Sequence, residues 1–250
     1  MRDITIASDA EDLYELAAEA FIQFAREAVE ERGVFYVALS GGSTPKAMYH
    51  LLTTEAYRDR VQWNNVKFYF GDERFVPPAA DQSNFRMAYL NLFKPLSIPP
   101  ANIFRWKTEI GETKHVARQY EQQISEMAAD GMPVFDLFLL GMGPDGHVAS
   151  LFPHSKALTE TQHLAVPNWI EKLHTWRLTM TYAVINRSRT VMFLVSGEEK
   201  AEALRDVLES KKNPEHLPAQ GVKPKDGRLL WFVDEGAAKY LKHKASSVHN

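Results

Sequence analysis

The chain has 250 residues, of which 45% are hydrophobic and 24% charged, and this composition is ordinary for a globular protein. Its formal net charge of −3 excludes a broad basic field that would hold nucleic acid or an anionic membrane, so an anionic ligand needs a local site. The absence of cysteine excludes disulfides, thiolate nucleophiles and cysteine-based zinc sites. The acidic N-terminal segment does not read as a signal peptide, and no apolar run approaches the ~18 residues of a spanning helix. We therefore expect a soluble, cytoplasmic protein that binds neither nucleic acid nor membranes.

The first predicted element is an amphipathic helix over residues 10–31, because its apolar side chains recur at steps of three and four and Gly33 follows as a stop signal. Apolar runs of strand length come next, each followed by a turn and by helical periodicity, at residues 34–40, 66–72 and 135–141. The later elements are a strand-like segment rich in Thr and Val, a strand that leads into a helix, and a last strand and helix, at residues 177–185, 191–197 and 231–241.

Strands that alternate with helices predict a parallel sheet covered on both faces. The sequence contains no internal repeat and no linker long enough to separate domains, and we interpret the Pro- and Lys-rich segment 211–227 as a surface loop. We expect one α/β domain over residues 1–250, with a doubly wound, mostly parallel, Rossmann-like sheet and helices on both faces. In such sheets ligands bind outside the carboxyl ends of the strands, so the residues after each strand are the candidates.

The turn after the first of these strands has the composition of a phosphate-binding loop. Glycines let the backbone approach a ligand, hydroxyl groups add donors, and Pro45 suits a first helical turn. A helix start offers amides and the positive end of its dipole to an anion. The loop matches neither the Walker nor the dinucleotide glycine pattern, and a hydroxyl-capped turn without a ligand is the alternative. The candidate phosphate contacts are Ser40, Gly41, Gly42, Ser43 and Thr44.

Two acids and an arginine follow the second strand. Asp72 and Glu73 are placed to orient the guanidinium of Arg74 towards a phosphate. The alternative is a local surface ion pair, worth ~0–1 kcal/mol. The position at a strand end favours the binding role.

The turn after the third strand, GMGPDGHVASLFP, contains a titratable imidazole. His147 can take a proton from water and return it to a leaving group, because imidazole titrates near neutral pH. Asp145 is a candidate to orient the ring or to contact the substrate, and the spacing leaves both roles open. His147 and His154 lie seven residues apart without an HExxH pattern, so we assign no metal site.

Lys200 follows another strand end and falls in the first turn of a predicted helix. The helix dipole disfavours a cation there, so an anion that shares the site would explain this lysine. A solvent-screened helix face is the alternative.

These motifs together resemble the 6-phosphogluconolactonase family, within the wider group that includes glucosamine-6-phosphate deaminases and isomerases. The histidine segment is highly specific, whereas SGGSTP and SGEEKA are shared more broadly. The resemblance implies a doubly wound fold and hydrolysis of 6-phosphoglucono-δ-lactone to 6-phosphogluconate in the oxidative pentose phosphate pathway, without a cofactor. The matching segments between about Val34 and Tyr240 are LSGGSTP, GDERFVP, SNFRMA, GMGPDGHVASLFP, RLTMT, SGEEKA, LPAQGVKP and WFVDEGAA.

The resemblance also implies roles for individual residues. His147 matches the proposed general base of the family, and Asp145 matches the acid of its GxDGH segment. Arg74 and Lys200 match cationic contacts to the substrate and its phosphate, and residues 40–44 match the phosphate loop. The implied partner is a small phosphorylated sugar lactone. The oligomeric state stays open, with a monomer as the expectation.

Three details are less determined by the resemblance. Arg177 matches a basic position of the RLTMT segment, and its role stays open. Asp72 is expected to organise the site, because lactone hydrolysis does not require the proton transfer that the corresponding acid performs in the deaminases. The donors that stabilise an oxyanion are not identified, and the backbone amides of residues 141–146 are one candidate.

Two alternative functions stay open. A deaminase or isomerase of aminosugar phosphates would carry an acid in an FNEP-like segment after the histidine, where this chain has Ser150, Leu151, Phe152 and Pro153. A sugar-phosphate-binding protein without activity usually carries a DNA-binding segment. The stretch before Val34 offers one helix, into which a helix-turn-helix does not fit.

Overall fold

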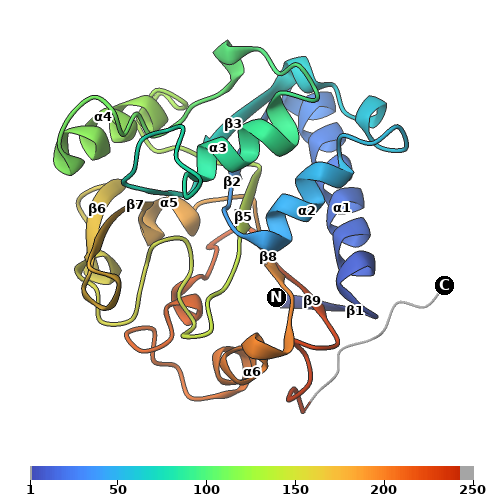
Figure 1. The fold of residues 1–250 in the computed structure, drawn as a ribbon, viewed down its shortest axis with the longest axis vertical. Helices are drawn as coiled ribbons and strands as arrows, with labels where there is room; N and C mark the ends of the chain where they lie inside the picture. Colours follow the sequence, from blue (N-terminus) through green and yellow to red (C-terminus); the bar gives the residue numbers. More distant parts are fainter. Residues whose placement is uncertain (1, 243–250) are drawn as a thin grey trace.

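The computed structural model describes residues 2–242, and within them nine strands form two sheets (Figure 1). The larger sheet has six strands in the order β1-β9-β8-β5-β2-β3, and every neighbouring pair is parallel. Its strands are β1 (Arg2–Ala7), β2 (Phe35–Leu39), β3 (Val66–Phe70), β5 (Leu137–Leu140), β8 (Thr190–Val195) and β9 (Arg228–Asp234).

The α-helices connect these strands. They are α1 (Ala10–Arg32), α2 (Ser43–Leu51), α3 (Asn84–Ala88), α4 (Thr113–Ser125), α5 (Tyr182–Ile185) and α6 (Ala201–Glu209). A π-helical turn, η3 (Tyr89–Phe93), continues α3. Short 3₁₀ turns complete the connections: η1 (Arg58–Arg60), η2 (Trp63–Asn65), η4 (Pro100–Asn102), η5 (Lys156–Thr159), η6 (Glu171–Leu173), η7 (Glu198–Lys200) and η8 (Pro218–Gly221).

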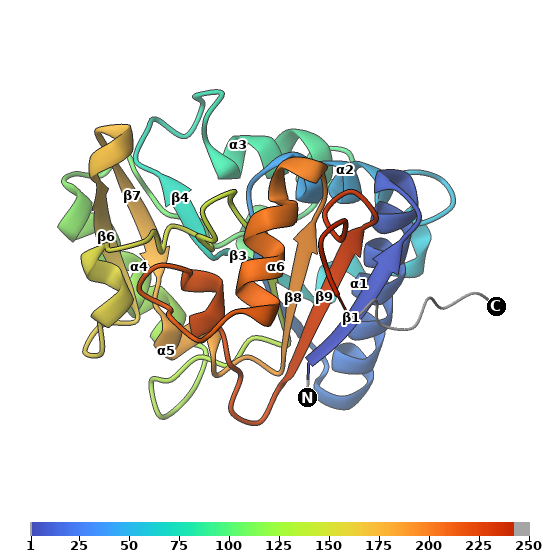
Figure 2. The ribbon, with the colours of Figure 1, turned by 90° about the horizontal axis from the view of Figure 1, so that it is seen from below.

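The direction of the crossovers explains why helices cover both faces of the larger sheet. The chain moves along the sheet one way from β1 to β2 and β3, and the other way from β3 to β5, β8 and β9. Right-handed crossovers then place α1 and α2 on one face, where α3 also packs against α2, and α6 on the other. Figure 2 shows α6 on the near side of β8 and α1 on the far side of the strands. The predicted doubly wound α/β fold is confirmed, and the direction reverses between β2 and β5.

The second sheet is antiparallel and was not expected from the sequence. It contains β4 (Asp72–Arg74), β7 (Thr175–Met180) and β6 (Ala165–Ile170), in the order β4-β7-β6. The strand predicted at 66–72 divides at Gly71, whose amide donates to the Leu39 carbonyl while its own carbonyl accepts from Met180 N. A Cβ at this position would lie 2.8 Å from the Phe138 ring, so only glycine fits between the sheets.

Other element boundaries also differ from the predictions. β1 was not predicted, and the segment 177–185 divides into the end of β7 and the short helix α5. No helix follows the last strand within the described residues, because the Asp234 carboxylate accepts from Ala237 N at 2.7 Å and holds a turn there. The segment 211–227 is mostly irregular as predicted, but it buries Ala219 and Val222.

The predicted first helix is confirmed as α1, and a capping residue stands at each of its ends. The carboxylate of Asp9 accepts from Asp12 N at 2.9 Å, and Gly33 adopts φ 74°, which closes the helix in the left-handed conformation. Its apolar face packs against the sheet through buried side chains such as Leu13 and Phe21. Each buried side chain of this kind contributes about 1.5–3 kcal/mol of hydrophobic stabilisation.

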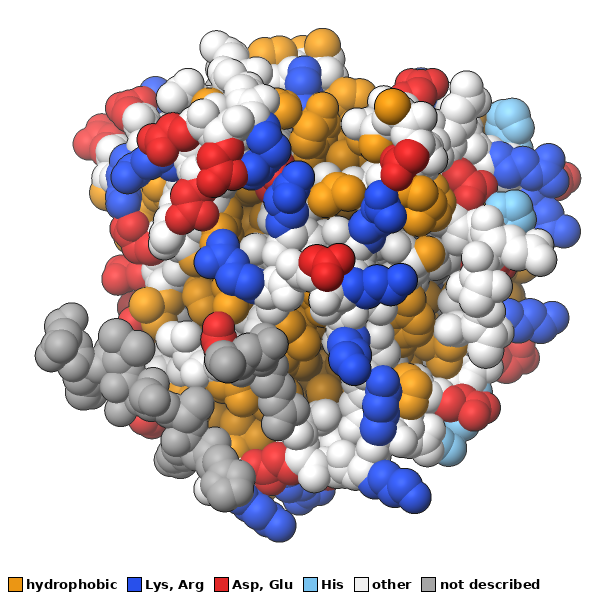
Figure 3. Space-filling view, turned by 180° about the vertical axis from the view of Figure 1, so that it is seen from behind, with side chains coloured by type: hydrophobic (Ala, Val, Ile, Leu, Met, Phe, Trp, Pro, Cys, Tyr) orange, Lys and Arg blue, Asp and Glu red, His pale blue; other side chains and the backbone are white. Residues whose placement is uncertain are grey.

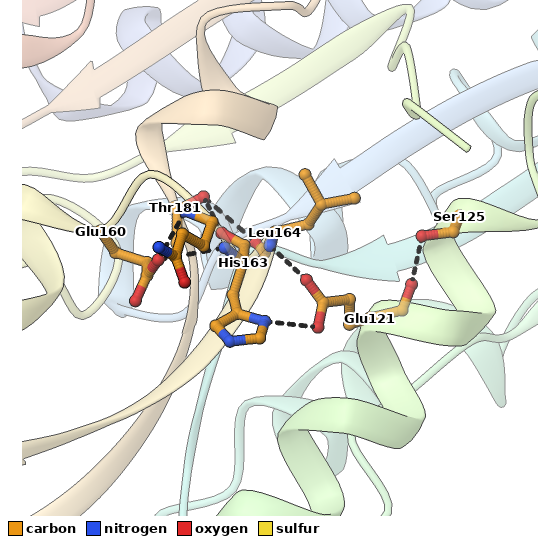
Figure 4. Close-up of polar contacts among 7 residues, drawn as sticks. Glu121, Ser125, Glu160, His163, Leu164 and Thr181 are labelled. Atoms are coloured by element: carbon orange, nitrogen blue, oxygen red, sulfur yellow. Dashed lines mark hydrogen bonds and ion pairs between the residues drawn. The ribbon is translucent and has the colours of Figure 1, made fainter. Parts of the chain in front are cut away.

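A single carboxylate on α4 fixes the start of the second sheet (Figure 4). Glu121 Oε1 accepts from Leu164 N at 2.5 Å, and Oε2 lies 3.1 Å from Nδ1 of His163. The hydroxyl of Thr181, just after β7, donates to the His163 carbonyl at 2.9 Å. The segments that flank β6 and β7 are therefore tied to each other and to the helix.

The described helices include no candidate membrane span. The face of the molecule in Figure 3 does not carry charge of a single sign. That face carries basic and acidic side chains close together, with hydrophobic side chains between them. Of the helices in residues 2–242, none combines the length and the hydrophobicity that a bilayer crossing requires. An anionic ligand on this face would meet charges of both signs.

Candidate active site

A cavity of about 240 Å³ lies at the carboxyl ends of β2, β5 and β8, where the winding of the chain reverses. It brings together the candidate residues of the sequence analysis except Glu73, Asp145 and Arg177, which do not line it. The lining residues are Ser40, Gly41, Gly42, Ser43, Thr44, Pro45, Asp72, Arg74, Asn84, Gly141, Met142, Gly143, Pro144, His147, Ala149, Leu194, Val195, Ser196, Glu199 and Lys200.

A buried tyrosine binds the backbone of the loop after β2. The hydroxyl of Tyr49 accepts from Ser40 N at 3.1 Å and donates to the Ser40 carbonyl at 2.9 Å. Burial raises the pKa of Tyr49, so the phenol stays neutral. No side chain caps the start of α2, although hydroxyls are present in the loop. The first amides of this helix are therefore open to a ligand at the cavity wall, which favours the phosphate-loop interpretation over the capped turn.

Gly41 allows a close contact between this loop and α3. A Cβ at residue 41 would lie 2.0 Å from Oδ1 of Asn84, which is a buried side chain. Nδ2 of Asn84 donates to the Asp72 carbonyl at 3.0 Å and lies 3.2 Å from Oδ1 of Asp72. Asn84 thus joins the loop after β2 to β4. Asn84 belongs to the matching segment SNFRMA, but no role was predicted for it from the sequence.

The two acidic residues of β4 have different structural roles. Asp72 Oδ2 accepts from Ser150 Oγ at 2.7 Å, so this carboxylate ties the end of the histidine turn to β4. The buried Glu73 accepts from Asn84 N, Phe85 N and the Ser83 hydroxyl and thereby caps α3. Burial raises the pKa of Glu73, while these backbone donors act in the opposite direction. Glu73 is therefore a structural residue.

The expectation that the acids orient Arg74 is wrong. Nη1 of Arg74 donates to the Gln82 carbonyl at 2.6 Å, and within the described chain no ion pair joins its guanidinium to Asp72 or Glu73. The physical reason is that both carboxylates already accept several donors from α3 and from the histidine turn. Neither acid therefore pairs with the Arg74 guanidinium at hydrogen-bond distance.

Arg177 stands directly opposite Arg74 across β4 and β7. Nε of each arginine is buried without a hydrogen-bond partner. Burial lowers the pKa of Arg177, and the charge of Arg74 adds to this effect. Like charges directly opposite each other in a sheet are destabilising. An anion between or beside the two guanidinium groups would offset that repulsion and satisfy the buried donors.

The histidine turn is closed by its own backbone. Gly143 N donates to the His147 carbonyl and Gly146 N donates to the Gly143 carbonyl, both at 3.0 Å. These two amides are therefore committed within the turn and cannot serve as the oxyanion donors considered above. Gly143 is also needed for space, since a Cβ there would lie 2.0 Å from Nδ1 of His147.

Asp145 orients the imidazole. Its Oδ1 lies 2.5 Å from Nδ1 of His147, and its Oδ2 forms an ion pair with Lys172. Burial raises the pKa of Asp145, but the hydrogen bonds from His147 and Lys172 outweigh it, so the pKa lies below its ordinary value. An ionised carboxylate at Nδ1 keeps the proton on that nitrogen, which leaves the lone pair on Nε2. The ring of Phe152 stacks on the imidazole, with centroids 4.0 Å apart.

Lys200 lies in η7, at the start of α6, and it forms no ion pair with any residue of the described part. The turn before it is fixed by Asp234, whose carboxylate accepts from the Ser196 hydroxyl and from Gly197 N. Gly197 has φ 102°, a conformation that favours glycine. The turn places Lys200 and its neighbour Glu199 on the cavity wall.

The site has no arrangement typical of a metal centre. Within residues 2–242, no group of three or more His, Cys, Asp or Glu side chains is placed to hold a metal ion. The site instead combines an oriented imidazole with several cationic side chains and the amides of a helix start. This arrangement suits proton transfer on an anionic substrate.

Comparison with known proteins identifies the family. Residues 8–231 match the family of glucosamine-6-phosphate isomerases/6-phosphogluconolactonase. The chain is 39% identical over 219 residues to the 6-phosphogluconolactonase of Synechocystis sp., covering 86% of this chain and 88% of that protein. Among solved structures it resembles the devB protein (TM-score 0.86, 31% identity, 96% and 99% of the two chains) and the 6-phosphogluconolactonase of Thermotoga maritima (TM-score 0.81, 31% identity, 94% and 100%). The chain therefore belongs to the glucosamine-6-phosphate isomerase/6-phosphogluconolactonase family.

Proposed function

We propose that this protein hydrolyses 6-phospho-D-glucono-1,5-lactone to 6-phospho-D-gluconate, a step of the oxidative pentose phosphate pathway, with His147 as the general base. The relatives at 34–39% identity are named 6-phosphogluconolactonase and are matched over most of their length, which supports this reaction. The observation that carries the mechanism is the imidazole held by Asp145 in the same cavity as Arg74, Lys200 and the uncapped start of α2.

The phosphate would be bound away from the reacting carbon. Amides and hydroxyls of residues 40–44 supply neutral donors, and Arg74 and Lys200, from β4 and η7, supply positive charge to the same cavity. Arg177 adds a second guanidinium beside Arg74. Binding energy at the phosphate then orients the lactone carbonyl near His147.

His147 would act on water. Nε2 takes a proton as the water oxygen forms a bond to C1, and a tetrahedral oxyanion results. The C1 bond to the ring oxygen then breaks, and the imidazolium gives its proton to that oxygen. Asp145 stabilises the imidazolium and holds the ring in the required tautomer. General base catalysis of this kind contributes ~10² to 10⁴ in rate, with no covalent intermediate.

Asp72 would organise the site rather than transfer protons. Its hydrogen bonds to Ser150 and Asn84 join the histidine turn, β4 and the phosphate loop, which supports this role. We further propose that residues 1–250 form one domain that works as a cytoplasmic monomer without a cofactor or metal. A single hydrophobic core that includes residues of both sheets supports the one-domain proposal.

The deaminase alternative is disfavoured by the contact of Phe152 with His147. An acid in this segment would support sugar ring opening, whereas here an apolar ring lies 4.0 Å from the imidazole, centroid to centroid. A protein that binds sugar phosphates without reaction would not need an imidazole paired to a carboxylate in its cavity.

The proposal is tested by generating the lactone enzymatically and following acid release with and without the purified protein. We expect acid release well above the spontaneous rate and no ammonia release from glucosamine 6-phosphate. Acid release at the spontaneous rate would refute the lactonase function. Ammonia release would favour the deaminase, and tight binding of 6-phosphogluconate without turnover would favour the binding protein.

A further inference from the structure

We propose that Lys172 is a positioning residue for the histidine, which it controls through Asp145 and Phe152. The inference rests on the proposed function, because it assigns Lys172 a role in the same reaction. Lys172 lies in η6, between β6 and β7, and does not line the cavity. No sequence motif connects it to the histidine turn.

The first connection between Lys172 and the imidazole is an ion pair. Nζ of Lys172 contacts Oδ2 of Asp145, while Oδ1 of the same carboxylate lies 2.5 Å from Nδ1 of His147. Each oxygen of the carboxylate therefore has one cationic or ring partner. The lysine fixes the rotation of the carboxylate, and the carboxylate in turn fixes the ring.

The second connection passes through an aromatic ring. Nζ of Lys172 lies 5.0 Å from the centroid of the Phe152 ring, within the range of a cation–π interaction. Phe152 stacks on His147 with an interplanar angle of 15°. The phenyl ring thus stacks on the imidazole, the carboxylate contacts Nδ1 of the imidazole, and Lys172 contacts both of these groups.

The hairpin that presents Lys172 is stiffened by its own side chains. Trp169 and Trp176 are opposite each other on β6 and β7, and their rings pack edge to face with centroids 5.5 Å apart. Nε1 of Trp169 donates to Glu171 at 2.7 Å, next to the lysine. β7 continues from this hairpin to Arg177, so one hairpin carries the second guanidinium and the partner of Asp145.

The charge of Lys172 also adjusts the strength of the base. Alone, the Asp145 carboxylate would stabilise the imidazolium strongly. The nearby ammonium offsets part of that field. The other charged side chains on the cavity walls come from β4 and η7, and none of them is substituted in the Lys172 variants: Asp72, Arg74, Glu199 and Lys200.

The test compares Lys172→Met, Lys172→Arg and the unrelated exposed variant Lys156→Met with the wild-type protein over pH. We expect Lys172→Met to lower kcat about tenfold, to leave KM within about twofold, and to move the acid limb of kcat/KM upward by about half a unit to one unit. Lys172→Arg, which keeps the charge, should restore most of the rate and the profile. Lys156→Met should match the wild-type protein.

A titration of the His147 ring by NMR separates this proposal from the proposed function, because it needs no substrate. We expect the midpoint of the ring signals in Lys172→Met to move upward by the same amount as the acid limb. Identical midpoints and profiles in Lys172→Met and wild-type protein would overturn the role of Lys172. An inactive wild-type protein whose ring titration still responds to Lys172→Met would instead overturn the lactonase function and leave the positioning role supported.

Discussion

The contact between Gly143 and His147 leads to a sharp prediction. In Gly143→Ala, the new Cβ would lie 2.0 Å from Nδ1 of His147 and 2.9 Å from Oδ1 of Asp145. Ordinary contact begins at about 3.4 Å, so the imidazole would have to retreat by more than ~1 Å. Residue 143 is outside the left-handed region, so alanine does not strain the backbone itself. A ~1 Å displacement of a reacting group can lower the rate ~10²-fold, which corresponds to about 2.7 kcal/mol of transition-state stabilisation.

The assay is lactone hydrolysis after subtraction of the spontaneous rate, with thermal unfolding measured on the same samples. We expect kcat to fall about 100-fold in Gly143→Ala and KM to change little, because the proposed phosphate contacts lie on other turns. Gly141→Ala is the matched comparison in the same turn. Its Cβ would meet nothing closer than Ser40 Oγ at 4.0 Å, so it should lose less than about threefold. A folded Gly143→Ala protein that keeps more than a third of the wild-type kcat would refute the reasoning.

Three further substitutions test separate parts of the site and fold. His147→Ala should lose ~10² to 10⁴ in kcat while it still binds 6-phosphogluconate in calorimetry, and unimpaired turnover would refute the general-base role. Lys200→Ala should raise KM about tenfold or more with a smaller change in kcat, and an unchanged KM would exclude it from phosphate binding. Glu121→Ala should lower the free energy of unfolding by about 1–3 kcal/mol in a denaturant titration, because it leaves Leu164 N unpaired. The exposed neighbour Gln122→Ala is its control, and equal stabilities of the two would contradict the anchoring role.

The main sheet was predictable because its central strands are buried on both faces. β5 and β8 have only buried residues, so their sequences are continuous apolar runs. β1 was not predicted, because it is an edge strand and its residues from Ile4 to Ile6 are only partly buried. The antiparallel sheet was not predicted for related reasons. β4 consists of three charged residues, and the edge strand β6 contains Pro167, which argues against a strand when seen in sequence alone.

The candidate site was predictable where it follows parallel strands, because the carboxyl ends of such strands meet at one edge. Residues 40–44, His147 and Lys200 all follow such strand ends, and they line one cavity. Lys172 was not predictable in this way, since the lysine reaches Asp145 only through the folding of a hairpin 27 residues further along the chain. The position of Arg177 opposite Arg74 was not predictable either, because it depends on the register of β4 against β7.

The two sheets contribute different parts of the site, and their junction determines how well those parts fit. The parallel sheet supplies the helix starts and the histidine turn, whereas the antiparallel sheet supplies Arg74, Arg177 and the hairpin of Lys172. A shift of one residue between β4 and β7 would turn one guanidinium to the other face, because side chains alternate along a strand. Gly71 prevents such a shift by its hydrogen bonds to both sheets and its close contact with Phe138. The charge arrangement around the imidazole is therefore set by packing at a glycine that carries no charge.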